Sequence, residues 1–419
     1  MEPREDEPSG ALRAGDRLSD TAPSDFPSAL SHLECAACGM RHDADVLQGR
    51  CGCGGTLLCR YDLSRVPKLA DIRALERGLA RYGSLLPLRA PAPSLGESET
   101  PLLALPKLSE RWGIEVLVKD DGPMPGGTFK ARGAAIGLGR AVELGISDVV
   151  MPSAGNAGGA WSLYAARLGV ALTVTMSITA PLANQAEVAI AGARLVLVDG
   201  SIADAGKRAV AIAAETGAFL AATFYEPYRL EGKKSAWLEL FDQMGDESSM
   251  RMPSEIVLPV GGGVAAIAAA KAAEEVTAAR WAVGESPRLV GVQTTDCDPI
   301  TRAFEAGAED VSPWDGHPSS IAAGLRVPAP VEGRLVLKTV RASGGVMASV
   351  TEDEIRCGMR TLAEEGVLAG PEGAATVAAA ERLVADGALV GPVVLYNTGS
   401  GYKYPEVLLE AAGQASSPT

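Results

Sequence analysis

Short aliphatic runs alternate with longer alanine-rich stretches from about Glu115 onward, and this alternation constrains the fold more than any other feature. The aliphatic runs have the length of buried strands and include EVLVK, DVVMPS, ALTVTMS, RLVLVDG, EIVLPVGGG, RLVGVQT and GPVVLYNTGSG. Stretches between them, such as KARGAAIGLGRAVELG and VAAIAAAKAAEEV, have helical periodicity. Strands alternating with helices predict βαβ units and parallel sheets. We therefore expect an α/β protein whose strands end in loops of small or polar residues, where open α/β sheets bind their ligands.

The length of the chain predicts two lobes. A chain of 419 residues is too long for one ordinary core and suits two α/β lobes with extensions. Because the sequence has neither a short-period repeat nor a long low-complexity linker, we expect the lobes to interleave. The first thirty residues are rich in Pro, Ser, Asp and Glu, which predicts a disordered tail. The expected organisation is this tail (1–30), a Cys-rich segment (31–65), a two-lobed region (66–410) with its smaller lobe at roughly 145–240, and a second tail (411–419).

Charge and hydropathy argue against several classes of partner. The chain has 38 Lys and Arg residues against 52 Asp and Glu residues, and its formal net charge of −14 repels nucleic acid and anionic membranes. The longest nearly apolar run, Ile256 to Ala270, is shorter than the roughly 20 residues of a membrane-spanning helix. The N-terminus contains no apolar targeting run. We expect a cytoplasmic protein that binds neither nucleic acid nor membrane.

Lys130 stands in the stretch PMPGGTFKARGAA, between a pair of glycines and a helix of small residues. The glycines allow a sharp turn, so the lysine is expected at a strand-to-helix junction. It is not a phosphate-loop lysine, because that motif needs Gly before the Lys and Ser or Thr after it. The alternative is a structural lysine that extends to water.

Three further loops have the composition of ligand sites. PSAGNAGG (152–159) opens a helix with an amide side chain beside free backbone N–H groups, although alone it reads as a helix N-cap. Gly261–Gly263 stand between a strand and a helix, the geometry that binds a phosphate on backbone N–H donors. NTGSGYKYPE (397–406) places Thr398 and Ser400 in a turn, where hydroxyls often bond only their own backbone.

Together these loops offer an amine, an amide, an anion cradle and a hydroxyl at the ends of parallel strands. Pyridoxal phosphate needs that set: a lysine for its aldehyde, a helix N-terminus for its phosphate, and hydrogen-bonding partners for its ring. The four loops therefore predict a pyridoxal-phosphate site.

On these residues the sequence resembles the fold type II family of pyridoxal-phosphate enzymes, and within it threonine synthase. The resemblance runs from about Glu34 to Tyr404 and includes the segments EPYRLEGKKSAWLEL, VGVQTTDCDPI, SSIAAGLRVP, EEGVLAGPEGAA and NTGSGYKYPE. It implies two interleaved three-layer αβα domains with mainly parallel sheets, as in the tryptophan synthase β-like fold. It also implies an amino-acid substrate and a homodimer.

The resemblance assigns roles to particular residues. It makes Lys130 the Schiff-base lysine, which can take the substrate's α-proton once substrate has released it. For the cofactor it also implies Asn156 at the ring hydroxyl, Gly261, Gly262 and Gly263 at the phosphate, and Thr398 at the ring nitrogen. A neutral hydroxyl there suits elimination or replacement rather than transamination. For the substrate we expect Ser153, Ala157, Arg229 and Lys233.

Four positions depart from the threonine synthase pattern. Ala131 and Ala157 stand where that family usually has Asp and Thr, and Thr223 and Phe224 stand where it has Asn and Ser. The segments TFKARGA and SAGN look instead like threonine dehydratase. These changes remove polar groups, so we expect weak binding of a phosphorylated substrate or preference for a non-phosphorylated one, unless Arg229 or Lys233 compensates. The alternative for the RLEGKK cluster is a solvated helix face with pairing between residues four apart.

The resemblance favours a lyase that converts O-phosphohomoserine, or a related amino acid with a leaving group, by elimination and addition of water. An ammonia-lyase of the threonine dehydratase type and a β-replacement synthase are the rival enzymes. A regulator that holds the cofactor without turnover is the non-enzymatic alternative, although the retained Lys130, Asn156, glycine cradle and Thr398 argue against it.

The N-terminal segment CAACGMRHDADVLQGRCGCGG carries Cys35 and Cys38 as C-x2-C, and Cys51 and Cys53 as C-x-C. Four thiolates on two glycine-bearing knuckles suit a structural Zn²⁺. Cys59 is an alternative ligand, and a small metal-free domain with buried thiols is the alternative structure.

Overall fold

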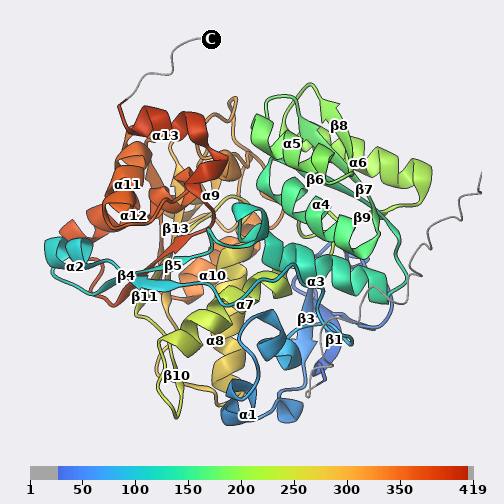
Figure 1. Cartoon of the computed structure of the whole chain (residues 1–419), viewed down its shortest axis with the longest axis horizontal. Helices are drawn as coiled ribbons and strands as arrows, with labels where there is room; N and C mark the ends of the chain where they lie inside the picture. Colours follow the sequence, from blue (N-terminus) through green and yellow to red (C-terminus); the bar gives the residue numbers. More distant parts are fainter. Residues whose placement is uncertain (1–26, 414–419) are drawn as a thin grey trace, which may run out of the picture.

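The computed structural model describes residues 27–413 and consists of two α/β lobes and a small β ribbon (Figure 1). Of the expected tail 1–30, residues 1–26 lie outside the described part of the chain. Beyond that point Ser28 and Ala29 are buried and Leu30 begins the first strand, so packed structure starts earlier than expected. Of the expected tail 411–419, residues 414–419 lie outside the described part, and Ala411 is the buried last residue of a helix.

The large lobe is built on a sheet of order β14-β13-β11-β15-β5-β4. Every pair in it is parallel except the edge pair β4–β5. All five residues of β11 are buried, as expected for the centre of a parallel sheet covered on both faces. The strands of this lobe are β4 (Leu102–Ala104), β5 (Val116–Asp120), β11 (Glu255–Pro259), β13 (Arg288–Thr294), β14 (Val346–Val350) and β15 (Val393–Asn397), with a separate parallel pair of β10 (Met250–Arg251) and β12 (Ala282–Val283).

The small lobe contains a fully parallel sheet of order β8-β7-β6-β9. Its strands are β6 (Asp148–Ser153), β7 (Ala171–Ser177), β8 (Arg194–Val198) and β9 (Phe219–Leu220). They fall within the expected range 145–240, between β5 and β11 of the large sheet, so the two lobes interleave as expected. The end of that range is helix α7 (Tyr228–Gln243), which packs against α8 (Val264–Ala278) and α3 (Lys130–Glu143).

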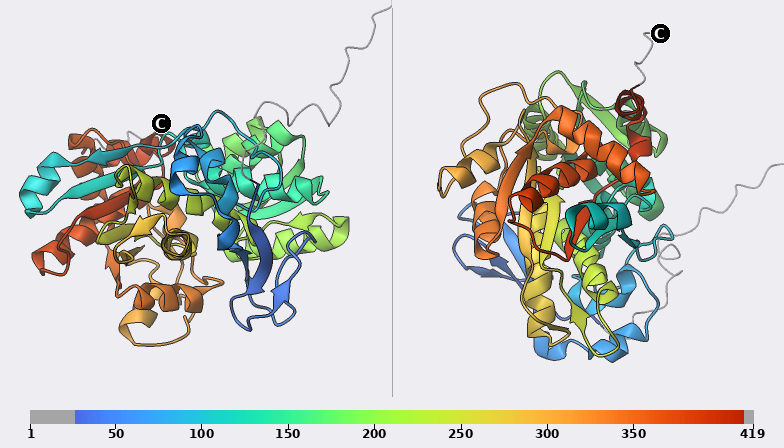
Figure 2. Two further views of the ribbon diagram at one scale, coloured as in Figure 1. Left: turned by 90° about the horizontal axis from the view of Figure 1, so that it is seen from below. Right: turned by 90° about the vertical axis from the view of Figure 1, so that its left-hand side faces the viewer.

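A three-stranded antiparallel sheet of order β2-β1-β3 forms the ribbon, which projects from one side of the molecule (Figure 2, left). Its strands are β1 (Leu30–Cys35), β2 (Arg41–His42) and β3 (Leu57–Tyr61). Tyr228, the first residue of α7, belongs to the same buried cluster as Leu33 and Cys59. The ribbon is therefore attached to the helix at the centre of the protein.

Helices cover both sheets, and several start at sequence-encoded caps. Ser201 and Asp204 form a capping box on α6, and Thr351 and Glu354 form one on α11. The helices not yet given are α1 (Leu69–Arg73), α2 (Pro106–Trp112), α4 (Asn156–Leu168), α5 (Leu182–Ile190), α6 (Ile202–Thr216), α9 (Pro299–Glu305), α10 (Gly333–Ala342), α11 (Glu352–Glu364), α12 (Pro371–Ala385) and α13 (Pro405–Ala411).

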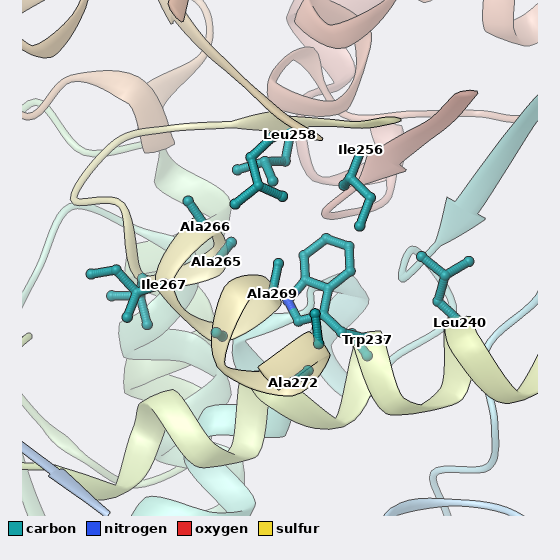
Figure 3. Packing of buried hydrophobic residues seen from close by; sticks show 14 of the residues in the cluster. Trp237, Leu240, Ile256, Leu258, Ala265, Ala266, Ile267, Ala269 and Ala272 are labelled. Atoms are coloured by element: carbon teal, nitrogen blue, oxygen red, sulfur yellow. The ribbon is translucent and has the colours of Figure 1, made fainter. Parts of the chain in front are cut away.

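The largest core lies where α7 and α8 meet β11. Trp237 of α7 is fully buried among Ala269 of α8 and Ile256 of β11 (Figure 3). The small alanine side chains of α8 let the helices approach closely and leave room for the indole. Among residues 27–413, no helix is long and apolar enough to cross a membrane. The expected α/β fold with mainly parallel sheets is confirmed.

Candidate active site

One cavity of about 610 Å³ lies between the lobes, where the loops that follow β5, β6, β11 and β15 converge. The two sheets deliver their strand ends to it, as the sequence predicts. Every residue that the sequence assigned to cofactor or substrate lines this cavity, namely Lys130, Ser153, Asn156, Ala157, Arg229, Lys233, Gly261, Gly262, Gly263 and Thr398.

Lys130 is the first residue of α3, and its Nζ lies 4.1 Å from the centre of the Phe129 ring. Its amine makes no hydrogen bond or ion pair with any residue of the described part of the chain. Burial lowers the pKa of Lys130 to about 8; Glu372 opposes this change and Arg229 adds to it. At pH 7 about a tenth of the amine is therefore unprotonated, far more than for a lysine of ordinary pKa, and the unprotonated form is the one that acts as nucleophile or base.

Asn156 is the first residue of α4, and only half of its amide is engaged. Its Nδ2 donates to the Tyr404 hydroxyl at 3.0 Å, and that hydroxyl donates to Glu372 Oε1 at 2.8 Å. The backbone N–H of Gly324 donates to the same carboxylate oxygen at 2.7 Å. The Asn156 Oδ1 is buried without a partner among the described residues. Because buried polar atoms are rarely left unpaired, this oxygen indicates a donor supplied by a ligand.

Two of the three cradle glycines are required by packing, and the third has room for a Cβ. A Cβ at Gly261 would lie 2.3 Å from the Gly324 carbonyl oxygen, and one at Gly263 would lie 2.1 Å from Val336 Cγ2. Gly263 also has φ of +84° as the N-cap of α8. At Gly262 the nearest atom to a Cβ is 3.9 Å away. All three glycines line the cavity, so a ligand in it can reach the backbone at the start of α8, where helix N–H donors have no partner within the helix.

Thr398 and Ser153 use their polar atoms differently. The Thr398 carbonyl accepts from the Phe129 N–H at 2.9 Å, while its hydroxyl has no hydrogen bond to a described residue. The Ser153 hydroxyl accepts from the N–H groups of Gly155 and Gly158 at 3.1 and 2.8 Å. Ser153 thus holds its own loop, and Thr398 keeps a hydroxyl for a ligand.

Arg229 is buried and already satisfied by the protein. Its guanidinium pairs with Glu226 and with the Ala221 carbonyl, donates to Thr223 Oγ1 at 3.2 Å, and stacks over the Trp161 ring at 4.6 Å. A substrate anion would therefore share this guanidinium with the protein.

Lys233 is buried but has no acidic partner within the described residues. Its Nζ lies 4.9 Å from the centre of the Phe129 ring. Burial, with the positive charges of Lys130 and Arg229, lowers the pKa of Lys233 well below its usual value. Positions 228–241 of α7 are all buried, so the interpretation of RLEGKK as a solvated face is wrong. The cluster is buried because acidic residues from other elements pair with it, such as Glu275 with Lys234.

The four departures from the threonine synthase pattern lie in two places. Ala157, Thr223 and Phe224 line the cavity. Ala131 is fully buried in the core cluster of the small lobe and does not line the cavity, so the expectation that it removes a donor from the substrate pocket is wrong. The side of α3 next to Lys130 faces the core because successive helix residues point about 100° apart.

Sequence reasoning missed several polar residues of the cavity wall, among them Glu372, Tyr404 and Asn184. Asn184 is 1% exposed and neither atom of its amide has a partner among the described residues. Glu372 and Tyr404 lie within the segments EEGVLAGPEGAA and NTGSGYKYPE, and the acid that follows Gly-Pro at an expected helix start was the available clue to Glu372. Nothing local to the sequence identifies Asn184.

A buried ionic network supports the lysine loop. The Arg132 guanidinium donates to Asp121 Oδ2 at 2.8 Å, to Glu239 Oε2 at 2.7 Å and to the Ser235 hydroxyl at 2.9 Å. The side chains of Arg132, Asp121 and Glu239 are all buried. Through these bonds α3 is tied to α7 and to the end of β5, which holds Lys130 in place.

The predicted metal ligands form a separate cluster on the ribbon. The sulfurs of Cys35, Cys38, Cys51 and Cys53 all lie within 4.8 Å of one another. Cys59 is fully buried in the ribbon core and is not part of the cluster. The cluster is therefore made of the four cysteines that the knuckle spacing predicts.

The cavity groups fit pyridoxal phosphate. Lys130 offers a free amine for the aldehyde, and the backbone N–H groups at the start of α8, near Gly262, can bind the phosphate. Thr398 and Asn156 can form hydrogen bonds with the polar atoms of the ring. The Lys130 amine, the Thr398 hydroxyl and the Asn156 Oδ1 each lack a protein hydrogen-bond partner within residues 27–413.

Comparison with known proteins agrees with this fit. The sequence profile of the pyridoxal-phosphate dependent enzyme family matches residues 93–399. The threonine synthase of Methanocaldococcus jannaschii is 32% identical over 390 residues, which cover 90% of this chain and 94% of that protein. That of Methanosarcina acetivorans is 32% identical over 392 residues, covering 91% and 94%.

Solved structures show the same fold. The threonine deaminase of T.th. matches with a TM-score of 0.60 and 26% identity, over 72% of this chain and 92% of that one. Maize serine racemase matches with a TM-score of 0.61 and 23% identity, over 72% and 88%.

Proposed function

Because this chain belongs to the family of pyridoxal-phosphate-dependent enzymes, and is a lyase of that family, we propose that it converts O-phospho-L-homoserine and water to L-threonine and phosphate. In this reaction the bond from the γ-carbon to the phosphate oxygen breaks and water adds at the β-carbon. The relatives named threonine synthase support it, since they align over most of this chain. The observation that carries the proposal is the buried Lys233 side chain, which has no acidic partner among the described residues and lies in the wall of the cavity that contains Lys130.

The cofactor-binding roles are part of the proposal. Lys130 binds the cofactor's aldehyde carbon, Asn156 meets the ring hydroxyl, the backbone from Gly261 to Gly263 holds the phosphate, and Thr398 meets the ring nitrogen. When bound, pyridoxal phosphate supplies an electron-accepting ring that stabilises negative charge at the substrate's α-carbon. Tyr404 orients Asn156 by its hydrogen bond at 3.0 Å.

Lys130 is also the proposed base. Its Nζ takes the proton from the substrate's α-carbon, because a pKa of about 8 leaves enough unprotonated amine near neutral pH. Thr398 offers the ring a neutral hydroxyl rather than a carboxylate, which favours elimination and addition over transamination.

Lys233 is the proposed partner of the substrate's leaving phosphate. An anion next to it would favour the protonated form of its amine and would form charge-assisted hydrogen bonds with it. Arg229 would assist, although Glu226 and Thr223 already occupy much of its guanidinium. Ser153 and Ala157 line the same cavity, with Ser153 acting through its loop.

A second candidate is an ammonia-lyase acting on threonine or serine. The apolar side chains of Ala157 and Phe224 in the cavity wall favour it, because they offer no donor to a phosphate. Turnover tests decide between the two. The purified enzyme is assayed with O-phosphohomoserine, O-phosphoserine, threonine and serine, and phosphate, ammonia and keto acid are measured separately.

We expect phosphate and threonine from O-phosphohomoserine without ammonia. Lys233→Met should raise KM for this substrate roughly 10- to 100-fold, the cost of a lost hydrogen bond to a charged group. The matched control is Lys207→Met, because Lys207 lines the same cavity but is exposed and pairs with Asp204 at 2.9 Å. Ammonia and keto acid from threonine, with no phosphate from O-phosphohomoserine, would replace the proposal by the second candidate.

A further inference from the structure

The four clustered cysteines of the ribbon have the geometry of a tetrahedral metal site. The Sγ–Sγ distances are 3.5 Å for Cys35–Cys53, 3.7 Å for Cys38–Cys51 and 3.5 Å for Cys53–Cys38. Four sulfurs at about 2.3 Å from a central zinc are separated by about 3.8 Å along each tetrahedral edge. The sulfurs are thus spaced as ligands of one ion, and no pair is close enough for a disulfide bond.

The backbone passes close to the sulfurs at Gly55. A Cβ at Gly55 would lie 2.6 Å from Cys35 Sγ and 3.4 Å from Cys53 Sγ. The second knuckle therefore needs glycine at this position to wrap around the sulfurs. Four thiolates complete the coordination of Zn²⁺ and leave no open position, so an ion here is structural.

The same knuckle touches the wall of the active-site cavity. The Thr56 hydroxyl lies 3.0 Å from the Phe224 carbonyl oxygen and 2.6 Å from Glu332 Oε1. Arg50 donates to Glu332 at 3.1 Å, and its guanidinium lies 5.0 Å from the centre of the Tyr225 ring. Arg50 and Thr56 flank the ligands Cys51 and Cys53 in sequence.

The segment that the knuckle touches needs external support. Phe224 has φ of 63°, a left-handed conformation that a bulky side chain adopts only when its surroundings impose it. Its neighbour Thr223 accepts a hydrogen bond from Arg229 at 3.2 Å, and both residues line the cavity. A shift of this segment would therefore move the wall next to Arg229.

We infer that the four cysteines bind one Zn²⁺, and that the metal-bound knuckle holds the segment 223–225 in the conformation that shapes the substrate side of the cavity. The ribbon has only a small hydrophobic core of its own, which is where a bound metal contributes most to folding. The effect on the substrate, unlike the metal site, rests on the proposed function.

The metal is tested on the full chain purified without added metal. Elemental analysis should give one zinc per chain, and Cys38→Ser and Cys53→Ser should each lose it. Both cysteines are exposed, and Cys357→Ser, at an exposed cysteine outside the cluster, is the matched control that should keep the metal. Protein without zinc, with the four thiols freely alkylated in the native state, would overturn the site, and iron in its place would overturn the choice of metal.

The coupling is tested with Thr56→Val, which keeps the ligands and removes the hydroxyl. Hydrogen exchange of segment 223–225 should become faster while the zinc content is unchanged. KM should rise roughly 2- to 10-fold, the effect of one lost hydrogen bond, with the cofactor absorbance unaltered. Unchanged exchange and KM would refute the coupling. If no substrate is turned over, zinc content and exchange still test this inference, and only the proposed function fails.

Discussion

Two neighbouring glycines of the cradle should respond to the same substitution in opposite ways. Gly263→Ala places a methyl 2.1 Å from Val336 Cγ2 on a backbone with φ of +84°. The left-handed conformation costs roughly 1–2 kcal/mol for a residue with a Cβ, and overpacking costs about 1–3 kcal/mol. The cofactor-free protein should therefore lose about 2–5 kcal/mol of unfolding free energy.

Gly262→Ala should leave the stability of the same protein within about 0.5 kcal/mol of the parent, since the nearest atom to the new methyl is 3.9 Å away. That methyl would lie between the backbone N–H donors at the start of α8 and a phosphate bound in the cavity. Cofactor affinity should fall at least about tenfold, which corresponds to about 1.4 kcal/mol.

Both quantities can be measured on the same three proteins. Urea unfolding is followed without cofactor, because bound ligand would stabilise the folded state and mask the difference. Cofactor affinity is then taken from the absorbance during titration with pyridoxal phosphate. If Gly262→Ala binds the cofactor as tightly as the parent, the phosphate does not lie at this cradle. If Gly263→Ala is as stable as the parent, the steric reasoning fails.

Other substitutions test the lysine and its support. Lys130→Ala should abolish the yellow absorbance and the borohydride-trapped adduct; an adduct mapped to another lysine would contradict the assignment. In the cofactor-free protein, amine labelling of Lys130 should rise with pH, with a midpoint near pH 8. The midpoint should move down in Glu372→Gln, because Glu372 favours the charged amine, and up in Arg229→Met, because Arg229 disfavours it. Because folding lowers the pKa of Lys130 from 10.5 to about 8, the charged amine destabilises the folded state below about pH 8, and this destabilisation disappears as the pH rises to about 10.5. A labelling midpoint near pH 10.5 would contradict the lowered pKa. Arg132→Met leaves Glu239 buried without its main partner and should cost about 3–5 kcal/mol in urea unfolding, and a loss below about 1 kcal/mol would show that the network is not needed.

Local sequence determined the framework of this protein. The alternation of strand and helix patterns predicted parallel sheets, and glycine-bearing loops after strands predicted where ligands bind. Strand ends of a parallel sheet meet at one edge, so the pattern alone predicts that residues as distant in sequence as Lys130 and Thr398 lie together. The cavity contains both of them, together with the glycine cradle.

Tertiary structure alone decided how those residues are held and which charges are buried. Tyr404 orients Asn156 from 248 residues away, and Thr56 contacts Phe224 from 168 residues away. Helix α7 was ambiguous, because its RLEGKK charges are typical of a solvated face. It is buried because Tyr61, Lys271 and Glu275 supply partners from other elements. Periodicity reports which face of an element is apolar, whereas the burial of a charge depends on partners that are brought near only when the chain folds.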